Sequence, residues 1–463
     1  MADLIQFVDG PTVSATVRLD LNDDDGALHV RNVDWSPARL SRVQVSNMLS
    51  DGGYVGPSSY GLRTLVLDMD LLQTTQDAWA GSYQALKREL DRATNWLMFK
   101  PTGATFPVFF KTYRSDVASL EEVYSAAAFR QASVEVIAEP FAYGERETIT
   151  VGTVNNDPAA GSNGCYFDVA GIKGDVAAPM VLVDTGTVTT DMVLAVKQDP
   201  LSSDFPVVFQ AESMTLESAD TTNPGGGPDA AMSGSGTNNY VRTSFTTTTA
   251  DALRLTAVGS TDAEKKAMRG LHRAWLTARR SDNTSTLKVH TSRVVNDATV
   301  NGDTVETPLT TNRHLLDLGL VSIGLGDAIN DDMVPTTSVS LYASRSSGSG
   351  QLQYDCLQFV PADVATCLLS GLSAGFTSND IVFDGERRQV LAVTSGTAIF
   401  SGGTVELRRT KYAGAIPTLA PGVTNRFFYI KYESATPLID KTVTGSVTIY
   451  YHPRYDMVKP LAS

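Results

Sequence analysis

The feature that most restricts the fold of this chain is a long series of short alternating segments separated by turn residues. Apolar and polar positions alternate through residues 1–60, and later Gly, Asn, Asp and Pro interrupt short β-branched runs such as Met180–Asp184. Turns about every 8–12 residues between such runs are typical of sandwiches and jelly rolls. Because only 19% of the 463 residues are charged, we expect a mainly β protein of about three domains rather than a helical bundle.

One stretch departs from this pattern and predicts a helix. An apolar stripe at alternating steps of four and three residues runs through Trp79, Tyr83, Leu86, Leu90, Ala93 and Leu97. Thr74, followed three residues later by Asp77, is a plausible N-terminal cap, and Pro101 with Gly103 would end the helix. We expect the stripe to pack on a sheet formed by neighbouring strands, among them Gln131–Ala138.

Changes in residue composition and in the spacing of turn residues along the chain predict four segments. Residues 1–150 are expected to form a β-sandwich or barrel with one packed helix, and residues 151–199 a linker with the first strands of an outer β domain. Residues 200–362 predict a middle β jelly roll, and residues 363–463 a C-terminal β-sandwich. Either the middle module is inserted into one sandwich made of the second and fourth segments, which we favour, or the domains follow one another.

The net charge of −14 and the pI of about 4.8 argue against a general duplex-DNA binder, which needs a basic surface to release counterions, and leave a local basic face as the alternative. Three cysteines, Cys165, Cys356 and Cys367, are too few and too scattered for a disulfide framework, so we expect folding in a reducing cytosol. No stretch reaches about 18 apolar residues, and the sequence therefore predicts no membrane-spanning helix.

A search for reactive constellations gives no candidate active site. None of the five histidines has HxxxH or HxH spacing. Leu276–Arg279 and Leu287–Ser292 predict a hairpin across which His272 and His290 would face each other. Two histidines without a third ligand make a weak case for zinc, and we expect surface or half-buried strand residues instead. Neither a GxSxG elbow nor a P-loop occurs. We expect a non-enzymatic protein without an obligatory cofactor.

The ends of the middle module resemble a known family. Phe209–Glu212 at its start and Tyr354–Pro361 at its end are similar to the first and last strands of galactose-binding-like jelly rolls, such as family 6 carbohydrate-binding modules. That resemblance implies a structural calcium ion held by Glu212 and Asp355, since hard carboxylate oxygens suit Ca²⁺. The alternative is that both are ordinary strand-end residues.

The same resemblance raises the question of glycan binding. Sugar C–H faces stack on exposed aromatic rings, and Tyr240 is the one position that matches the family's loop platform loosely. Trp275 is expected to be a core residue. The module could therefore bind a glycan or serve only as a decorative, packing domain.

The N-terminal 150 residues carry a second resemblance. A predicted closing strand leads into the acidic-Pro-aromatic segment Glu139-Pro140-Phe141, and Ser58–Arg63 precedes the alternating strand Thr64–Asp70. This order, with one helix between the strands, resembles the distal tail protein of siphophages.

Two later motifs resemble the same group of phage tail proteins. Gly174–Pro179 is similar to their Gly-Asp-Val-Pro-Ala-Pro linker, and Ile416–Asn425 to the Pro-x-Leu-x-Pro-Gly-x-Asn turn of their C-terminal sandwich. In that turn Pro421-Gly422 presets a tight reversal, and the side chain of Asn425 can cap it.

The resemblance implies a structural protein of the virion, made in the host cytoplasm and placed at the tip of a long non-contractile tail. Copies would form a ring, commonly a hexamer, that joins the tail tube to the tip or baseplate. The implied partners are the tail tube protein, the tape measure protein and the hub proteins. Two alternatives are a tail-tip adhesin that binds host glycan and a secreted polysaccharide-active enzyme. Against the enzyme stand the missing signal peptide and the missing catalytic constellation.

Overall fold

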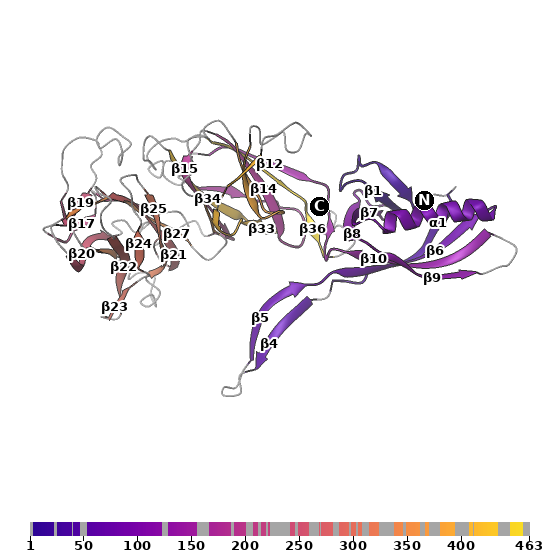
Figure 1. Cartoon of the computed structure of the whole chain (residues 1–463), viewed down its shortest axis with the longest axis horizontal. Helices are drawn as coiled ribbons and strands as arrows, with labels where there is room; N and C mark the ends of the chain where they lie inside the picture. The colour runs from indigo at the N-terminus through magenta and orange to yellow at the C-terminus, as the bar shows by residue number, and fades with distance from the viewer. Residues whose placement is uncertain are drawn as a thin grey trace.

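The computed structural model describes residues 3–456 apart from a set of short segments. The segments left out are 23–25, 39, 47–52, 123–127, 155–165, 187–188, 201–206, 212–213, 219–220, 223–240, 246–248, 259–267, 269, 281–286, 296–297, 302–303, 308–313, 324–337, 346–348, 362–365, 370–379, 394–406, 411 and 434–444. The described strands form three units that follow one another along the long axis of the molecule (Figure 1). We call them the N-terminal unit, the outer sandwich and the module.

The N-terminal unit contains one curved sheet around its own core. Its strands are β1 (Leu4–Val8), β2 (Val17–Asp20), β3 (Leu28–Asp34), β6 (Arg63–Gln73), β7 (Thr94–Lys100), β8 (Val108–Tyr113), β9 (Asp116–Glu122), β10 (Ala128–Ala138) and β11 (Ala142–Tyr143). They follow the order β2-β1-β7-β8-β10-β6-β3, with β9 beside β10 and β11 beside β8. A bridge between Asn22 and His29 brings the two edges of the sheet together.

The burial of β6 shows why this sequence forms a strand. Alternate residues point into the core, namely Arg63, Leu65, Leu67, Met69 and Leu71, while those between them are less buried. This period of two is what a half-buried strand requires. The prediction of a mainly β chain with one helix in the N-terminal unit is confirmed over the described residues.

The helix in the structure is shorter than the helix that the apolar stripe predicts. Helix α1 (Gln76–Leu90) begins after Thr75, whose side chain accepts a hydrogen bond from the amide of Ala78, and not after Thr74. It ends at Leu90, well before Pro101. The stripe overestimates the helix because the position of Leu97 fits a helix and a strand equally well. Leu97 continues the helical spacing, but it also alternates with Phe99 in β7, where both side chains are buried. The pairing of β7 with β1 and β8 makes this segment a strand.

The outer sandwich combines strands from before and after the module. One sheet has the order β12 (Glu147–Val154), β35 (Gly445–Tyr451), β14 (Ala178–Gly186), β29 (Asp380–Asp384), β30 (Gln389–Val393) and β31 (Leu407–Thr410), with β33 (Thr418–Leu419) beside β14. The facing sheet has the order β13 (Tyr166–Val169), β34 (Asn425–Glu433), β15 (Thr189–Gln198), β28 (Thr366–Leu369) and β32 (Tyr412–Gly414). The last strand, β36 (Arg454–Tyr455), pairs with β11 of the N-terminal unit.

The turn that precedes β34 forms as its sequence predicts. Asn425 is fully buried and its side chain donates to the carbonyl oxygens of Ala420, at 2.9 Å, and Val423, at 3.3 Å. Its own Oδ1 accepts from the amide of Ala420 at 2.9 Å, and Gly422 has a φ of 74°. The prediction that Asn425 caps this turn is confirmed.

The module consists of two sheets that enclose a separate core. The first has the order β18 (Thr221–Thr222), β19 (Val241–Phe245), β27 (Gly350–Pro361), β21 (Gly270–Arg280) and β25 (His314–Ile323), with β16 (Val207–Gln210) beside β27. The second has the order β17 (Thr215–Leu216), β20 (Thr249–Val258), β26 (Ser338–Arg345), β22 (Leu287–Val295) and β23 (Ala298–Asn301), with β24 (Val305–Thr307) beside β22.

The predicted hairpin within the module is wrong. β21 and β22 are consecutive but lie in different sheets, because β21 pairs with β25 and β27, whereas β22 pairs with β26. His272 and His290 therefore do not face each other across a hairpin. A turn signal between two strands cannot distinguish a hairpin from a crossing between sheets.

Among the described residues, no helix has the length and hydropathy needed to cross a bilayer.

Candidate assembly site

A two-stranded arm projects from the N-terminal unit. It consists of β4 (Leu40–Ser46) and β5 (Gly53–Tyr60), which pair only with each other in a sheet of their own. In Figure 1 the arm leaves the body of the molecule beside β10 and projects below the outer sandwich. An isolated two-stranded sheet is marginally stable in water. The arm is therefore the described element that most needs a partner outside its own chain.

A buried arginine fixes the base of the arm. Arg63, only 3% exposed, donates to the carbonyl oxygens of Trp35 at 3.2 Å, Ser36 at 2.8 Å and Pro140 at 3.3 Å. These carbonyls belong to the chain entering the arm and to the link between β10 and β11. Burial lowers the pKa of Arg63, and the charge of Asp456 acts against this. One side chain thus ties the chain that enters the arm to the link between β10 and β11.

The base of the arm also presents apolar surface. Tyr60 packs edge-on against Phe141, with ring centroids 4.9 Å apart, yet it remains 43% exposed. Leu62 beside it is 57% exposed. Exposed aromatic and aliphatic side chains next to an unsupported hairpin suit a contact with another protein.

The C-terminal strand joins the N-terminal unit to the outer sandwich. In the pairing of β11 with β36, Ala142 lies opposite Tyr455, and Tyr143 lies opposite Arg454. The amide of Gly144 donates to the carbonyl oxygen of Pro453 at 2.8 Å. The last described residues of the chain therefore lie against the point at which the chain first leaves the N-terminal unit.

The Gly174–Pro179 motif forms the seat for this strand. The amides of Asp175 and Val176 donate to the carbonyl oxygen of Arg454 at 2.9 and 3.2 Å, and a carboxylate oxygen of Asp175 accepts from the amide of Asp456 at 2.7 Å. Gly174 has a φ of 109°, and a Cβ there would lie 2.7 Å from that carbonyl oxygen of Arg454. Only glycine allows this approach without a shift of the backbone.

A charged network fills the N-terminal side of the junction. Glu139 accepts hydrogen bonds from Lys111 at 2.7 Å, from Tyr113 at 2.8 Å and from Tyr143. Burial raises the pKa of this carboxyl, but the hydrogen bonds from these three partners outweigh burial and hold it below the ordinary value. Arg454 lies over the ring of Tyr143, 5.4 Å from its centroid. The junction is thus closed by backbone pairing and ring contacts, and the Glu139 network holds Tyr143 on its N-terminal side.

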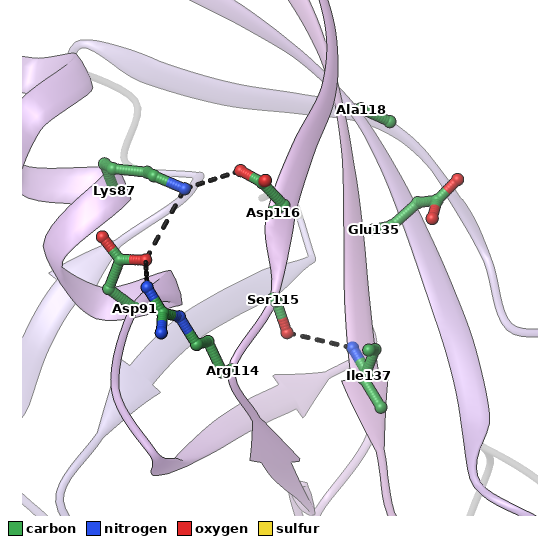
Figure 2. A pocket seen from close by; sticks show the side chains of 8 residues that line it. All are labelled: Lys87, Asp91, Arg114, Ser115, Asp116, Ala118, Glu135 and Ile137. Carbon is green, nitrogen blue, oxygen red and sulfur yellow. Dashed lines mark hydrogen bonds and ion pairs between the residues drawn. The ribbon is translucent and has the colours of Figure 1, made fainter.

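A polar cleft with a volume of about 300 Å³ lies between the end of α1, β9 and β10. Figure 2 shows the side chains that line it. Lys87 binds Asp116 at 2.6 Å and Asp91 at 3.6 Å, and Arg114 lies 3.5 Å from Asp91. Both basic side chains already face carboxylates, and the hydroxyl of Ser115 donates to the carbonyl oxygen of Tyr113 at 2.6 Å and accepts from the amide of Ile137 at 3.0 Å.

The residues predicted as sites are not brought together by any described contact. Tyr240 and Glu212 lie outside the described residues. Asp355 lies in β27 where the register against β21 slips, since Thr277 pairs with Cys356 and Ala278 pairs with Tyr354; its side chain is not among those described. Within the described part of the chain no group of three or more His, Cys, Asp or Glu side chains could hold a metal ion.

The sequence alone gave no role to Arg63, Glu139 or Arg454, although Arg63 and Glu139 lie in the segments that resemble phage tail proteins. A signal was present for Arg63, because the alternation of β6 puts it on the same face as Leu65 and Leu67. A charged residue on a core face is normally paired or hydrogen-bonded. For Arg454 the partner is about 310 residues away in the sequence, and no local pattern indicates it.

No protein-family model matches the sequence, and no curated protein matches it significantly. Among solved structures the chain is similar to the SPP1 Dit protein of the hub adsorption apparatus, at 14% identity and a TM-score of 0.31, over 42% of this chain and 70% of that one. It is also similar to a chain of the phage P2 baseplate, at 8% identity and a TM-score of 0.25, over 78% and 99%. A third likeness, to infectious bursal virus T=1 particles, has 10% identity and a TM-score of 0.18, over 67% and 78%. Scores this low decide neither fold nor function.

Proposed function

We propose that this chain is a structural, non-enzymatic protein of the tail tip of a long-tailed phage, where copies of it form a ring. The observation that carries the proposal is the arm of β4 and β5, which pairs with no other described strand of its own chain. An element of this kind gains its stability by packing on another protein, and copies that contact one another head to tail form a ring when the rotation between them closes.

The sequence motifs specify the kind of assembly. The segments that resemble phage tail proteins include the base of the arm at Arg63, the Glu139 network and the Gly174 seat, and these are the parts that hold the arm and the junction in place. We therefore propose a hexameric ring built from the N-terminal units, placed between the tail tube protein and the hub or baseplate proteins, with the tape measure protein near its axis. The outer sandwich and the module extend away from the N-terminal unit (Figure 1).

The first test locates the protein in the particle. Gold-labelled antibody against the chain should decorate intact particles at the tail tip in negative stain. Purified particles that lack the chain altogether would contradict the proposal.

The second test removes the arm. Replacing residues 41–59 by a short turn should leave the melting temperature within about 2 °C, because the arm contributes nothing to the described sheets of the body and Tyr60 keeps its contact with Phe141. The same change should abolish ring formation on tail tubes, scored by electron microscopy. Leu320→Ala, an exposed position in the module, is the control and should leave rings intact. Rings that persist without the arm would contradict the proposed mechanism.

A second candidate function is host-glycan binding by the module. It is favoured by the position of the module at the end of the molecule opposite the N-terminal unit (Figure 1). In this proposal Tyr240 stacks on the sugar, and Glu212 with Asp355 holds a structural Ca²⁺. A glycan array probed with the whole chain, with and without Tyr240→Ala, tests the first point. A calcium-dependent rise in melting temperature that Asp355→Asn removes tests the second.

A further inference from the structure

A third layer of buried side chains lies between the module and the outer sandwich. The cores of the two units are filled from the inner faces of their sheets. A separate cluster draws on both units: Val193, Ala195, Phe428 and Ile430 come from the outer sandwich, and Trp275, Cys356 and Val360 come from the module. Tyr166 and Leu368 of the outer sandwich pack against its edge. Two sheets therefore meet through their outer faces.

The alternation along the strands supports this assignment. In β21, Leu276 belongs to the module core, whereas its neighbour Trp275 belongs to the shared cluster and is fully buried. In β34, Tyr429 belongs to the core of the outer sandwich, whereas Phe428 and Ile430 point to the shared cluster and are also fully buried. Both strands are thus covered on two faces, as in the middle layers of stacked sheets.

The shared cluster also contains buried polar groups. Among the described residues, the indole Nε1 of Trp275 and the Oε1 of Gln358 are buried without a hydrogen-bond partner. The thiol of Cys356 makes a weak hydrogen bond to the hydroxyl of Thr277, with its Sγ 3.4 Å from that oxygen. An unsatisfied buried polar group costs free energy, and the shared layer is built from seven buried apolar side chains, against more than twenty in each of the two cores. This layer is therefore less stable than the cores on either side of it.

We infer that the module is docked on the outer sandwich through this layer as a stiff extension, and that the layer opens as a unit before either core unfolds. Docking occupies the outer face of the sheet that contains β21 and β27. The sheet of β20, β22 and β26 is left on the far side of the module, so a partner of the module would meet that sheet or the rim. Exposed Leu271 and Leu320 lie on strands of the docked sheet.

Cys356 provides a built-in reporter of docking. It lies in the shared layer, 2% exposed, whereas Cys367 lies in the core of the outer sandwich, fully buried. The whole chain, with Cys165→Ser, is treated with a thiol reagent under native conditions, and mass spectrometry follows the two cysteines separately. Both should react at least ~100-fold more slowly than in denaturant, since each needs an opening step. Cys356 should react faster than Cys367.

Substitutions at the layer should separate the two rates. Trp275→Ala should accelerate labelling of Cys356 at least ~10-fold while leaving Cys367 unchanged, because a large contact is lost only from the shared layer. Trp275→Phe should restore most of the protection. Leu320→Ala, exposed on the same module sheet, is the matched control and should change neither rate. If Trp275→Ala does not fold, Val360→Ala makes a smaller change in the same layer.

Two results would overturn the inference. If Cys356 of the unsubstituted chain reacts as fast as in denaturant, the module is not docked. If the layer variants accelerate Cys356 and Cys367 equally, the layer does not open apart from the cores. Neither result would bear on ring formation, which depends on the N-terminal unit.

Discussion

Gly174 is the residue whose missing side chain allows the C-terminal strand to reach its seat. Gly174→Ala should lower the free energy of unfolding by about 2–4 kcal/mol, since it adds backbone strain and a close contact with the Arg454 carbonyl oxygen, 2.7 Å from the added carbon. Gly171→Ala is the matched control, because Gly171 has a φ of 71° but nothing within 4 Å. It should cost only about 1 kcal/mol. Equal losses in urea titrations would mean that the contact does not matter.

Glu139 makes the junction sensitive to acid. Its pKa is lower in the folded chain than in the unfolded one, so the unfolded chain binds more protons in acid. The carboxylate therefore contributes stability above its unfolded pKa, and this contribution is lost as the pH falls through the lower, folded pKa. Glu139→Gln should destabilise the protein at pH 7 by about 1–2 kcal/mol, less than a fully buried pair, because Lys111 is 37% exposed.

Urea titrations at several pH values check this prediction. The difference between the unsubstituted protein and Glu139→Gln should be largest at neutral pH and should shrink toward pH 3. Glu135→Gln is a suitable control, because Glu135 lies on β10 with its side chain exposed. A difference that is independent of pH would assign the effect of Glu139→Gln to packing rather than charge.

At the scale of the element, α1 distinguishes two neighbouring threonines. Thr75→Ala should cost about 1 kcal/mol, since it removes the hydrogen bond to the amide of Ala78. Thr74→Ala should change stability by less than ~0.5 kcal/mol, because the helix begins one residue later. Thermal unfolding of the two variants checks both values. A larger loss of stability for Thr74→Ala than for Thr75→Ala would mean that Thr74 caps the helix, as the sequence alone indicates.

The elements also show how far the sequence could be read. Alternation in β6 and the turn capped by Asn425 depend on neighbouring residues, and both were predictable. The end of α1 was not, because Leu97 satisfies a helical and a strand period at once, and only pairing with β1 and β8 decides. Trp275 was expected in a core. It is buried, but in a layer shared by two units, which burial patterns in a single strand cannot specify.

At the scale of the whole molecule, long-range pairing determines the arrangement. β12 pairs with β35 and β11 pairs with β36, so strands near residue 150 are held by strands near residue 450. Composition and local pattern indicated β domains and turns. They could not indicate which strands are neighbours, because alternation is the same whichever partner a strand has. The base of the arm likewise depends on Arg63, Pro140 and Asp456, residues far apart in the sequence.

The strand β36 therefore holds the N-terminal unit and the outer sandwich in one orientation. Its removal should free the two units to move relative to each other. Deleting residues 453–463 should speed amide exchange at Gly144, Asp175 and Val176, whose acceptors are the carbonyls of Pro453 and Arg454. Amides of β10 that pair with β6 should stay protected. Deleting only residues 457–463 leaves β36 in place and is the control. If the three amides exchange equally in both deletions, the pairing of β36 does not hold the junction.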